Sequence, residues 1–272
     1  MKKFKLNPPL LRSALSIVAN VLAATGLISL ISLSGIYALS LNEKTLHKVL
    51  FVVVGFSAGS ILGAVYFDLL PEAVELVGEL SFVYMALGFI SFFFLERFLY
   101  WYHGHGHRED IEALPAIPGR ANTNEFAYLN LVGDAIHNFI DGLVIAASFL
   151  ASPAVGLAAT IAIIFHELPQ EMGDYGILIY GGFKRRMALV LNFAVALTVV
   201  LGGATALFLI GSVEALSGVL IALAAGGFIY LGASELVPEL HEEKTLGRSV
   251  LQFVAFLLGM ALIWSLGIVF PE

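Results

Sequence analysis

The chain alternates long apolar segments with short polar connections. Each apolar segment reaches the roughly 20 residues that a helix needs to cross the hydrocarbon core of a bilayer. The segments lie at residues 11–40, 49–70, 81–102, 126–150, 154–180, 187–210, 216–236 and 250–269. This pattern predicts an all-α integral membrane protein with eight transmembrane helices in one domain over residues 1–272.

The connections between these segments constrain how the helices pack. Only Ala151, Ser152 and Pro153 separate the fourth segment from the fifth, so these two helices must be antiparallel neighbours. The longest connection, at about 103–124, contains two prolines and is predicted to be a flexible loop. Its histidines form either a surface metal site or an incidental run in that loop. They are His103, His105 and His107.

Lysine and arginine predict the orientation. Ten of the fourteen fall on one side of the predicted bundle, which should be cytoplasmic and leaves both termini outside a plasma (cell inner) membrane. They are Lys44, Lys48, Arg97, Arg108, Arg120, Lys184, Arg185, Arg186, Lys244 and Arg248. The basic start of the chain opposes this orientation. It resembles a signal peptide, but the apolar run continues to about Leu39 without a small-residue cleavage site, which favours a first spanning helix.

A weak internal repeat links the second segment to the seventh. Ala58–Glu72 aligns without gaps on Ala225–Glu239 with five identical residues, and Asp68 aligns with Glu235. The two segments cross the bilayer in opposite directions, and inverted repeats of this kind are typical of alternating-access carriers. The alternative is chance similarity between two apolar helices that both end in Leu-x-Pro-Glu.

Composition narrows the class further. The chain is 59% hydrophobic and 13% charged, with a mean hydropathy of +0.91, as expected if most of it lies in lipid. It contains no cysteine, which excludes disulfides and thiolate metal sites. A formal charge of −7 argues against nucleic acid as a partner and fits a surface that attracts cations.

Ionisable residues interrupt the fourth and fifth apolar segments. Each costs about 2.5 to 3.5 kcal/mol at mid-membrane on insertion scales, so such a cluster needs a compensating partner. Nitrogen and oxygen donors without thiolate suit Zn, Fe, Mn or Cd, which makes a divalent cation the best candidate. Helical spacing groups the residues of each segment on adjoining faces. They are Asp134, His137, Asn138 and Asp141, and then His166, Glu167, Gln170, Glu171 and Asp174.

Proline and glycine add two local predictions. Pro169 lacks an N–H, which should free the carbonyl of Phe165 and kink the helix beside His166. The alternative is a kinked helix whose polar residues bond only to one another. Gly142, Gly156 and Gly173 are predicted to permit close helix packing.

The two polar motifs together resemble the signature of the ZIP (Zrt/Irt-like) family of divalent metal transporters, in the branch marked by HExPxExGD. The motifs are His137-Asn138-Phe139-Ile140-Asp141-Gly142 and His166-Glu167-Leu168-Pro169-Gln170-Glu171-Met172-Gly173-Asp174. The resemblance implies an eight-helix homodimeric carrier with a binuclear metal centre between helices 4 and 5. It implies ligands at His137, Asn138, Asp141, His166, Glu167 and Gln170, with Asp141 bridging two ions and Glu171 as a further candidate.

Three departures from the family pattern matter. Gln170 stands where this branch often has histidine, which is a better ligand, so one of the two sites is expected to be weak or auxiliary. Ile140 replaces a frequent proline, which should leave helix 4 less kinked. Ala64 and Asp68 replace the common aspartate and histidine of helix 2, which should alter the path or the metal preference.

The leading functional hypothesis is transport of zinc, or of Cd, Fe or Mn, into the cytoplasm by alternating access. The protein would then be no enzyme, and its partners would be the metal ion and the lipid bilayer. One alternative is an intramembrane zinc metalloprotease, because His166 and Glu167 form half of an HExxH motif, although Gln170 takes the second histidine position. Another alternative is a membrane metal sensor without transport.

Overall fold

The structure is a computed structural model that describes residues 8–35, 43–103, 123–210, 215–241 and 245–269. Most of the predicted loop at 103–124, including His105 and His107, lies outside the described residues. In the described ranges every regular element is helical. The longer helices are α1 (Pro8–Ile31), α3 (Glu43–Ala64), α5 (Leu80–His103), α7 (Thr123–Ala151), α8 (Pro153–Tyr180), α9 (Arg185–Ala196), α10 (Thr198–Ile210), α11 (Ala215–Tyr230) and α13 (Leu246–Val269).

Shorter elements extend or follow these helices. A 3-10 turn, η1 (Ser32–Ser34), follows α1. A π-helix, η2 (Val65–Leu69), joins α3 to α4 (Leu70–Val77), and a second π-helix, η3 (Leu231–Leu236), joins α11 to α12 (Val237–His241). The second predicted segment therefore runs on to Val77, and the segment at 187–210 is divided at Leu197.

Six helical segments of the described chain are long and apolar enough to cross a membrane. They are Leu15–Ser34, Lys48–Val77, Asn130–Ala151, Arg185–Leu209, Leu216–Ser234 and Leu246–Val269. This confirms an all-α membrane protein. The predicted segments 81–102 and 154–180 form α5 and α8, but neither is among these six, and α8 carries three acidic residues. Eight spanning helices therefore stay a prediction.

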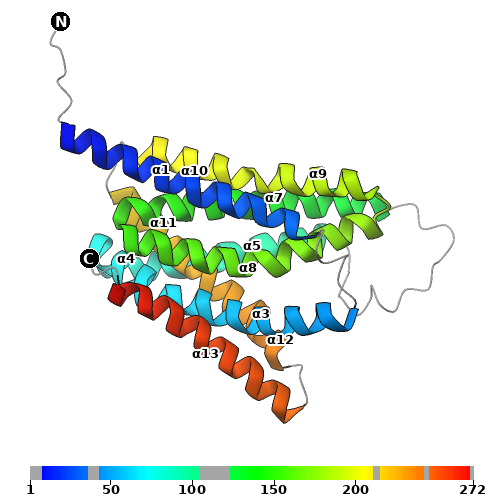
Figure 1. The fold of residues 1–272 in the computed structure, drawn as a ribbon. Coiled ribbons are helices and arrows are strands. Elements are labelled where there is room, and N and C mark those ends of the chain that lie inside the picture. The colour runs from blue at the N-terminus through cyan, green and yellow to red at the C-terminus, as the bar shows by residue number, and fades with distance from the viewer. Residues whose placement is uncertain (1–7, 36–42, 104–122, 211–214, 242–244, 270–272) are drawn as a thin grey trace, which may run out of the picture.

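Successive helices run back and forth between the two ends of the bundle (Figure 1). The start of α1 and the end of α13 lie at the same end, on the left of the figure, together with α4. The opposite end holds the starts of α3, α7, α9 and α13, so the described basic residues Lys48, Lys184, Arg185, Arg186 and Arg248 gather there. Glu72 and Glu75 of α4 lie at the end with the termini, which agrees with the predicted charge asymmetry.

Helices α7 and α8 lie in the middle of the bundle. Their buried residues Ile145 and Ile163 share one apolar core with Ile61 of α3 and Phe228 of α11. By contrast, α13 exposes large apolar side chains such as Leu258 and Trp264, at 57% and 56%. A surface of this kind suits contact with lipid, so the two motif helices are sheltered while α13 is peripheral.

The two π-helices occupy equivalent positions of the predicted internal repeat. The Leu70 N–H donates to the Val65 carbonyl in η2, and the Val237 N–H donates to the Gly232 carbonyl in η3. Each donor immediately precedes a proline of the repeat, Pro71 or Pro238. Because proline cannot donate to the i−4 carbonyl, the preceding turn has widened to the i−5 bond in both halves.

Two glycines of the repeat also have matching contacts. A Cβ on Gly59 would collide with the carbonyl of Phe256, and a Cβ on its counterpart Gly226 would collide with the carbonyl of Met85. Gly59 thus brings α3 close to α13, and Gly226 brings α11 close to α5. The correspondence between the two aligned segments therefore extends from sequence to hydrogen bonding and packing.

The glycine predictions in the motif helices have mixed outcomes. Gly142 contacts the backbone of Val199, which confirms close packing of α7 against α10, and Gly156 packs against the Phe149 ring. No atom of the described residues would lie within 4 Å of a Cβ on Gly173, so the prediction of close packing there is wrong. Helix α8 continues as an α-helix through Pro169. Among the described residues, π-helical turns are found next to Pro71 and Pro238, in η2 and η3, and not at Pro169.

Candidate metal centre

A tight turn between α7 and α8 sets the geometry of the centre. Ser152 caps α8, since its hydroxyl accepts a hydrogen bond from the Val155 N–H, and Pro153 occupies the first turn, where its missing N–H costs nothing. The helices therefore return antiparallel, as the short connection predicted. His137 is the middle residue of α7, and His166 and Glu167 are the middle pair of α8.

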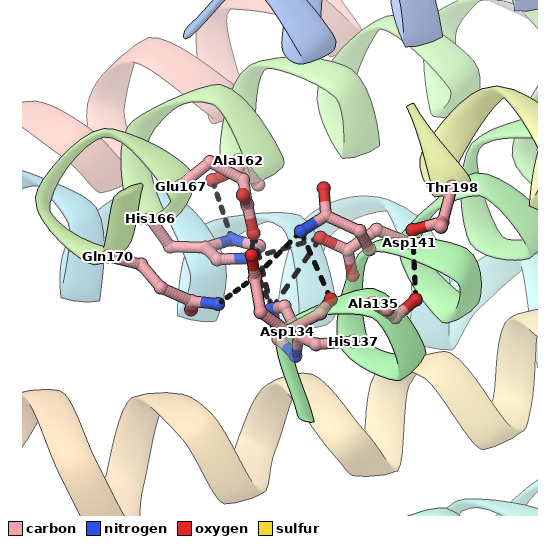
Figure 2. Close-up of polar contacts among 10 residues, drawn as sticks. Asp134, Ala135, His137, Asp141, Ala162, His166, Glu167, Gln170 and Thr198 are labelled. Carbon is pink, nitrogen blue, oxygen red and sulfur yellow. Dashed lines mark hydrogen bonds and ion pairs between the residues drawn. The ribbon is translucent and has the colours of Figure 1, made fainter. Parts of the chain in front are cut away.

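Four side chains from these two helices converge. One ligand atom from each of His137, Asp141, His166 and Glu167 lies within 4.8 Å of the others. Figure 2 shows the side chains pointing toward one another between α7 and α8. We call these four residues the four-ligand group.

Four of the distances within the four-ligand group match the edges of a tetrahedral zinc site. The His166 Nε2 atom lies 3.3 Å from the His137 Nε2 atom, 3.2 Å from Asp141 Oδ2 and 3.4 Å from Glu167 Oε1. His137 Nε2 lies 3.3 Å from Glu167 Oε1 and 3.8 Å from Asp141 Oδ2. Metal–ligand distances of 2.0 to 2.1 Å in a tetrahedron give ligand–ligand edges of about 3.3 to 3.4 Å. The side chains are therefore placed for one zinc-sized cation with little rearrangement.

A backbone contact fixes the chemistry of His166. Its Nδ1 atom lies 3.3 Å from the Ala162 carbonyl one turn earlier. A carbonyl can only accept, so a neutral ring that donates to Ala162 carries its proton on Nδ1 and its lone pair on Nε2. That lone pair faces the Asp141 carboxylate at 3.2 Å, so two electron pairs meet unless a cation or a proton lies between them.

Burial strengthens this demand for positive charge. Asp141 and Glu167 are fully buried and His166 is 5% exposed, whereas the side chain of His137 keeps 14%. Among the described residues, Asp141 Oδ1 and Glu167 Oε2 have no hydrogen-bond donor, while Asp141 Oδ2 and Glu167 Oε1 face only imidazole nitrogens. Two buried carboxylates with so few donors are costly, and a divalent cation compensates both at once.

The other predicted ligands lie outside the four-ligand group. Asn138 and Gln170 both direct their amide nitrogens at Asp134, at 2.8 and 3.3 Å from Oδ1. Glu171 faces α9, where its Oε2 accepts a hydrogen bond from the amide of Asn192. The structure thus brings together four of the seven predicted ligands and gives the remaining three other polar partners.

Two asparagines with evident roles were missed by the sequence analysis. Asn192 bonds both to Glu171 and to the Ser32 carbonyl, so it links α9 to α8 and η1. Asn130 donates to Asp174 at 2.7 Å. A lone asparagine inside the apolar segment 187–210 was the available signal for Asn192. Its partner could not be identified without the packing.

Comparison with known proteins gives consistent matches. The family model "ZIP Zinc transporter" matches residues 15–125 and 117–267. The zinc transporter YKE4 of Saccharomyces cerevisiae is 29% identical over 235 residues, which cover 79% of this chain and 68% of the relative. Mouse zinc transporter ZIP13 is 31% identical over 247 residues, or 76% of this chain and 67% of the relative.

A third relative is the human metal cation symporter ZIP8, which is 30% identical over 291 residues, covering 82% of this chain and 63% of the relative. Matches to some other relatives cover a smaller share of the relative's length. The zinc transporter zipt-7.2 of Caenorhabditis elegans is 37% identical over 147 residues, only 32% of its length. The chain therefore spans between about one third and two thirds of the curated relatives it matches.

Proposed function

The chain belongs to the ZIP zinc transporter family, and from this premise we propose that it carries divalent metal ions through a membrane by way of the four-ligand group of α7 and α8. The observation that carries the proposal is the set of ligand distances near 3.3 Å at mid-helix. Zinc is the ion that fits these distances best, and Cd, Fe and Mn are further substrates.

The donor chemistry suits an ion that must bind and then leave. Imidazole and carboxylate groups replace the water around the ion as it enters, and no thiolate is present to hold it permanently. The partial exposure of His137 makes it the first of the four ligands to meet an arriving ion. The buried Asp141 and Glu167 then neutralise the charge of the ion inside the bundle.

Alternating access through an inverted repeat is the proposed transport mode. Support comes from the repeat-equivalent features of α3 and α11, namely the paired π-helical hydrogen bonds and the contacts of Gly59 and Gly226. The repeat would relate one helix pair, α3 with α13, to the other, α11 with α5. The single domain over residues 1–272, with eight spans and a loop at about 103–124, forms part of the same proposal.

A second ion site beside the first is also proposed. Asn138, Gln170 and Glu171 lie within one turn of the four-ligand group and carry oxygen donors. With Asp141 bridging, they would hold an auxiliary ion. The site would be weaker than the first because Gln170 and Glu171 already have protein partners.

For orientation and assembly we propose that the basic end faces the cytoplasm of a cell whose plasma (inner) membrane holds the protein. Both termini would then lie outside, and transport would be inward. The acidic residues of α4 at the opposite end would raise the local concentration of cations. A homodimer is proposed on the family resemblance alone.

The protease interpretation is abandoned, because the family comprises transporters and not enzymes. The chemistry agrees with this, since Gln170, at the position of the second histidine of HExxH, bonds to Asp134.

The test is flux of Zn, Cd, Fe and Mn into proteoliposomes that contain the purified protein. We expect zinc to accumulate well above the level in protein-free vesicles. Zinc binding without accumulation would instead identify a membrane metal sensor, and neither binding nor flux would reject the proposal.

A further inference from the structure

Asp134 lies between the amide groups of two predicted ligands. It is on α7, three residues before His137, and is 5% exposed. Its Oδ1 atom accepts hydrogen bonds from Asn138 Nδ2 at 2.8 Å and from Gln170 Nε2 at 3.3 Å. Since Gln170 is on α8, this one carboxylate oxygen ties the two motif helices together directly beside the four-ligand group (Figure 2).

A carboxylate next to an amide decides which way the amide turns. The Oδ1 atom of Asp134 is the acceptor of both hydrogen bonds, so both amides present their NH₂ groups to Asp134. The carbonyl oxygen of each amide is therefore turned away. In Asn138, which is fully buried, that oxygen receives no hydrogen bond from the described residues and keeps its lone pairs for another partner.

We propose that Asp134 is a positioning residue that sets the metal preference of the centre. By holding the NH₂ group of Asn138, it makes Asn138 an oxygen donor to the ion, because an NH₂ group cannot serve as a ligand. By accepting a hydrogen bond from Gln170, it keeps the amide of Gln170 bonded to the protein. This inference rests on the proposed function, because it assumes that the four-ligand group binds a metal ion.

The effect should differ between metals. Zinc is satisfied by four ligands in a tetrahedron, which His137, Asp141, His166 and Glu167 already supply. Manganese prefers more ligands and mainly oxygen, so it depends more on the amide oxygen of Asn138. Asp134 thus favours the binding of the harder ion.

The first experiment replaces Asp134→Asn and measures dissociation constants of Mn²⁺ and Zn²⁺ by titration calorimetry on the purified, detergent-solubilised chain. An amide at 134 can donate as well as accept, so only the backbone carbonyl of residue 134, 3.2 Å from Asn138 Nδ2, still favours the present orientation of Asn138. We expect manganese affinity to fall about tenfold, the size of one hydrogen bond to a charged group, and zinc affinity to fall less than about threefold. Asp134→Glu retains an acceptor and should keep the parent Mn/Zn ratio.

The matched control is Asp174→Asn. Asp174 is a buried carboxylate on the same helix pair that also accepts an amide hydrogen bond, from Asn130, which is no predicted ligand. Its replacement removes the same charge and should leave the Mn/Zn ratio unchanged. If both variants shift the ratio equally, the effect is one of charge alone and the proposal is overturned.

A double substitution tests whether Asp134 acts through Asn138. In an Asn138→Ala background, Asp134→Asn should have no further effect on manganese affinity, and a persisting tenfold loss would show that Asp134 binds the ion itself. Asp134→Ser serves as a second variant if the asparagine variant does not fold. If the unsubstituted protein binds neither metal, the proposed function is refuted. If it binds metal but Asp134→Asn leaves the ratio of manganese to zinc affinity unchanged, only this inference is refuted.

Discussion

Two groups of buried acids lie about one turn apart on the same helix pair, and they differ in what faces them. In the four-ligand group, Asp141 and Glu167 face imidazole nitrogens. In the neighbouring group, each acid has one oxygen that accepts from an amide NH₂. Its members are Asp134, Glu171 and Asp174, which we call the amide-held acids.

This difference shows where a cation is needed. An amide NH₂ partly satisfies an acid, so the amide-held acids have protein donors and a defined orientation. The imidazole of His166 offers a lone pair to Asp141, because its proton is engaged by Ala162. Similar buried charge thus yields a structural network in one place and a metal centre in the other, according to the partner.

The largest effect is expected from removal of an imidazole. His137→Ala and His166→Ala should each weaken zinc binding by about 100-fold or more, since a direct ligand is lost. Zinc flux into proteoliposomes should fall to background. His241→Ala is the control, because His241 is an exposed residue of α12 away from the centre. Unchanged flux in either ligand variant would reject the assigned site.

Next in size is the contrast between two aspartates. Asp141→Asn should lower zinc affinity about 10- to 100-fold, while Asp174→Asn should change it less than about threefold. Both substitutions remove one buried charge from the same helix pair, so calorimetric titration of the two variants compares the two groups directly. Equal losses would mean that the distinction between the groups has no functional meaning.

Acidification should weaken zinc binding by the four-ligand group. Zinc binds neutral histidine and ionised carboxylate, so protons compete with the ion at both kinds of ligand. Zinc affinity should therefore fall about tenfold or more between roughly pH 7.5 and pH 5.5. Titrations across this range check the sign, and an affinity that rises on acidification would contradict the assigned donor set.

The role of the amide-held acids is tested through the free energy of unfolding of the protein. Asn192→Leu keeps the branched arrangement of side-chain heavy atoms but removes the amide that bonds to Glu171, which is 1% exposed. A buried acid without its donor should lower the free energy of unfolding by about 1 to 3 kcal/mol. A thermal melt in detergent measures the loss, and zinc titration of the same variant should match the parent. A large change in zinc affinity would place Glu171 at the ion.

The smallest effect is expected at position 170. Gln170→His should tighten zinc binding by only about threefold, because position 170 is directed at Asp134 and reaches the ion only after rearrangement. Competition between zinc and manganese would reveal any accompanying change in preference. Superimposable titrations of the two proteins would show that position 170 does not touch the ion.

Much of this arrangement could be predicted from the sequence because its determinants are local. The spacing of His137 and Asp141 by four places them on one helix face, and the three-residue turn forces α8 to return alongside α7. The alignment of Ala58–Glu72 on Ala225–Glu239 likewise pointed to the two segments that contain the π-helices, although the repeat itself stays a prediction. The assignment to a membrane class followed from segment lengths alone.

Other features depend on which of several possible partners a side chain contacts, and the sequence does not show this choice. Gln170 shares a helix face with His166, so spacing alone made it a ligand, yet Asp134 holds its amide. The π-turns gave no signal in hydrophobic periodicity, because one widened hydrogen bond barely changes the pattern. Gly173 was wrongly placed at a close contact because the direction of its helix face was unknown.

The short chain separation within the centre has a consequence for assembly. His137 and His166 lie only 29 residues apart, with Asp141 and Glu167 between or beside them. Closing so small a loop costs little chain entropy. All four metal donors therefore meet once a single hairpin has formed, so their convergence does not have to wait for α11 and α13, which are synthesised later.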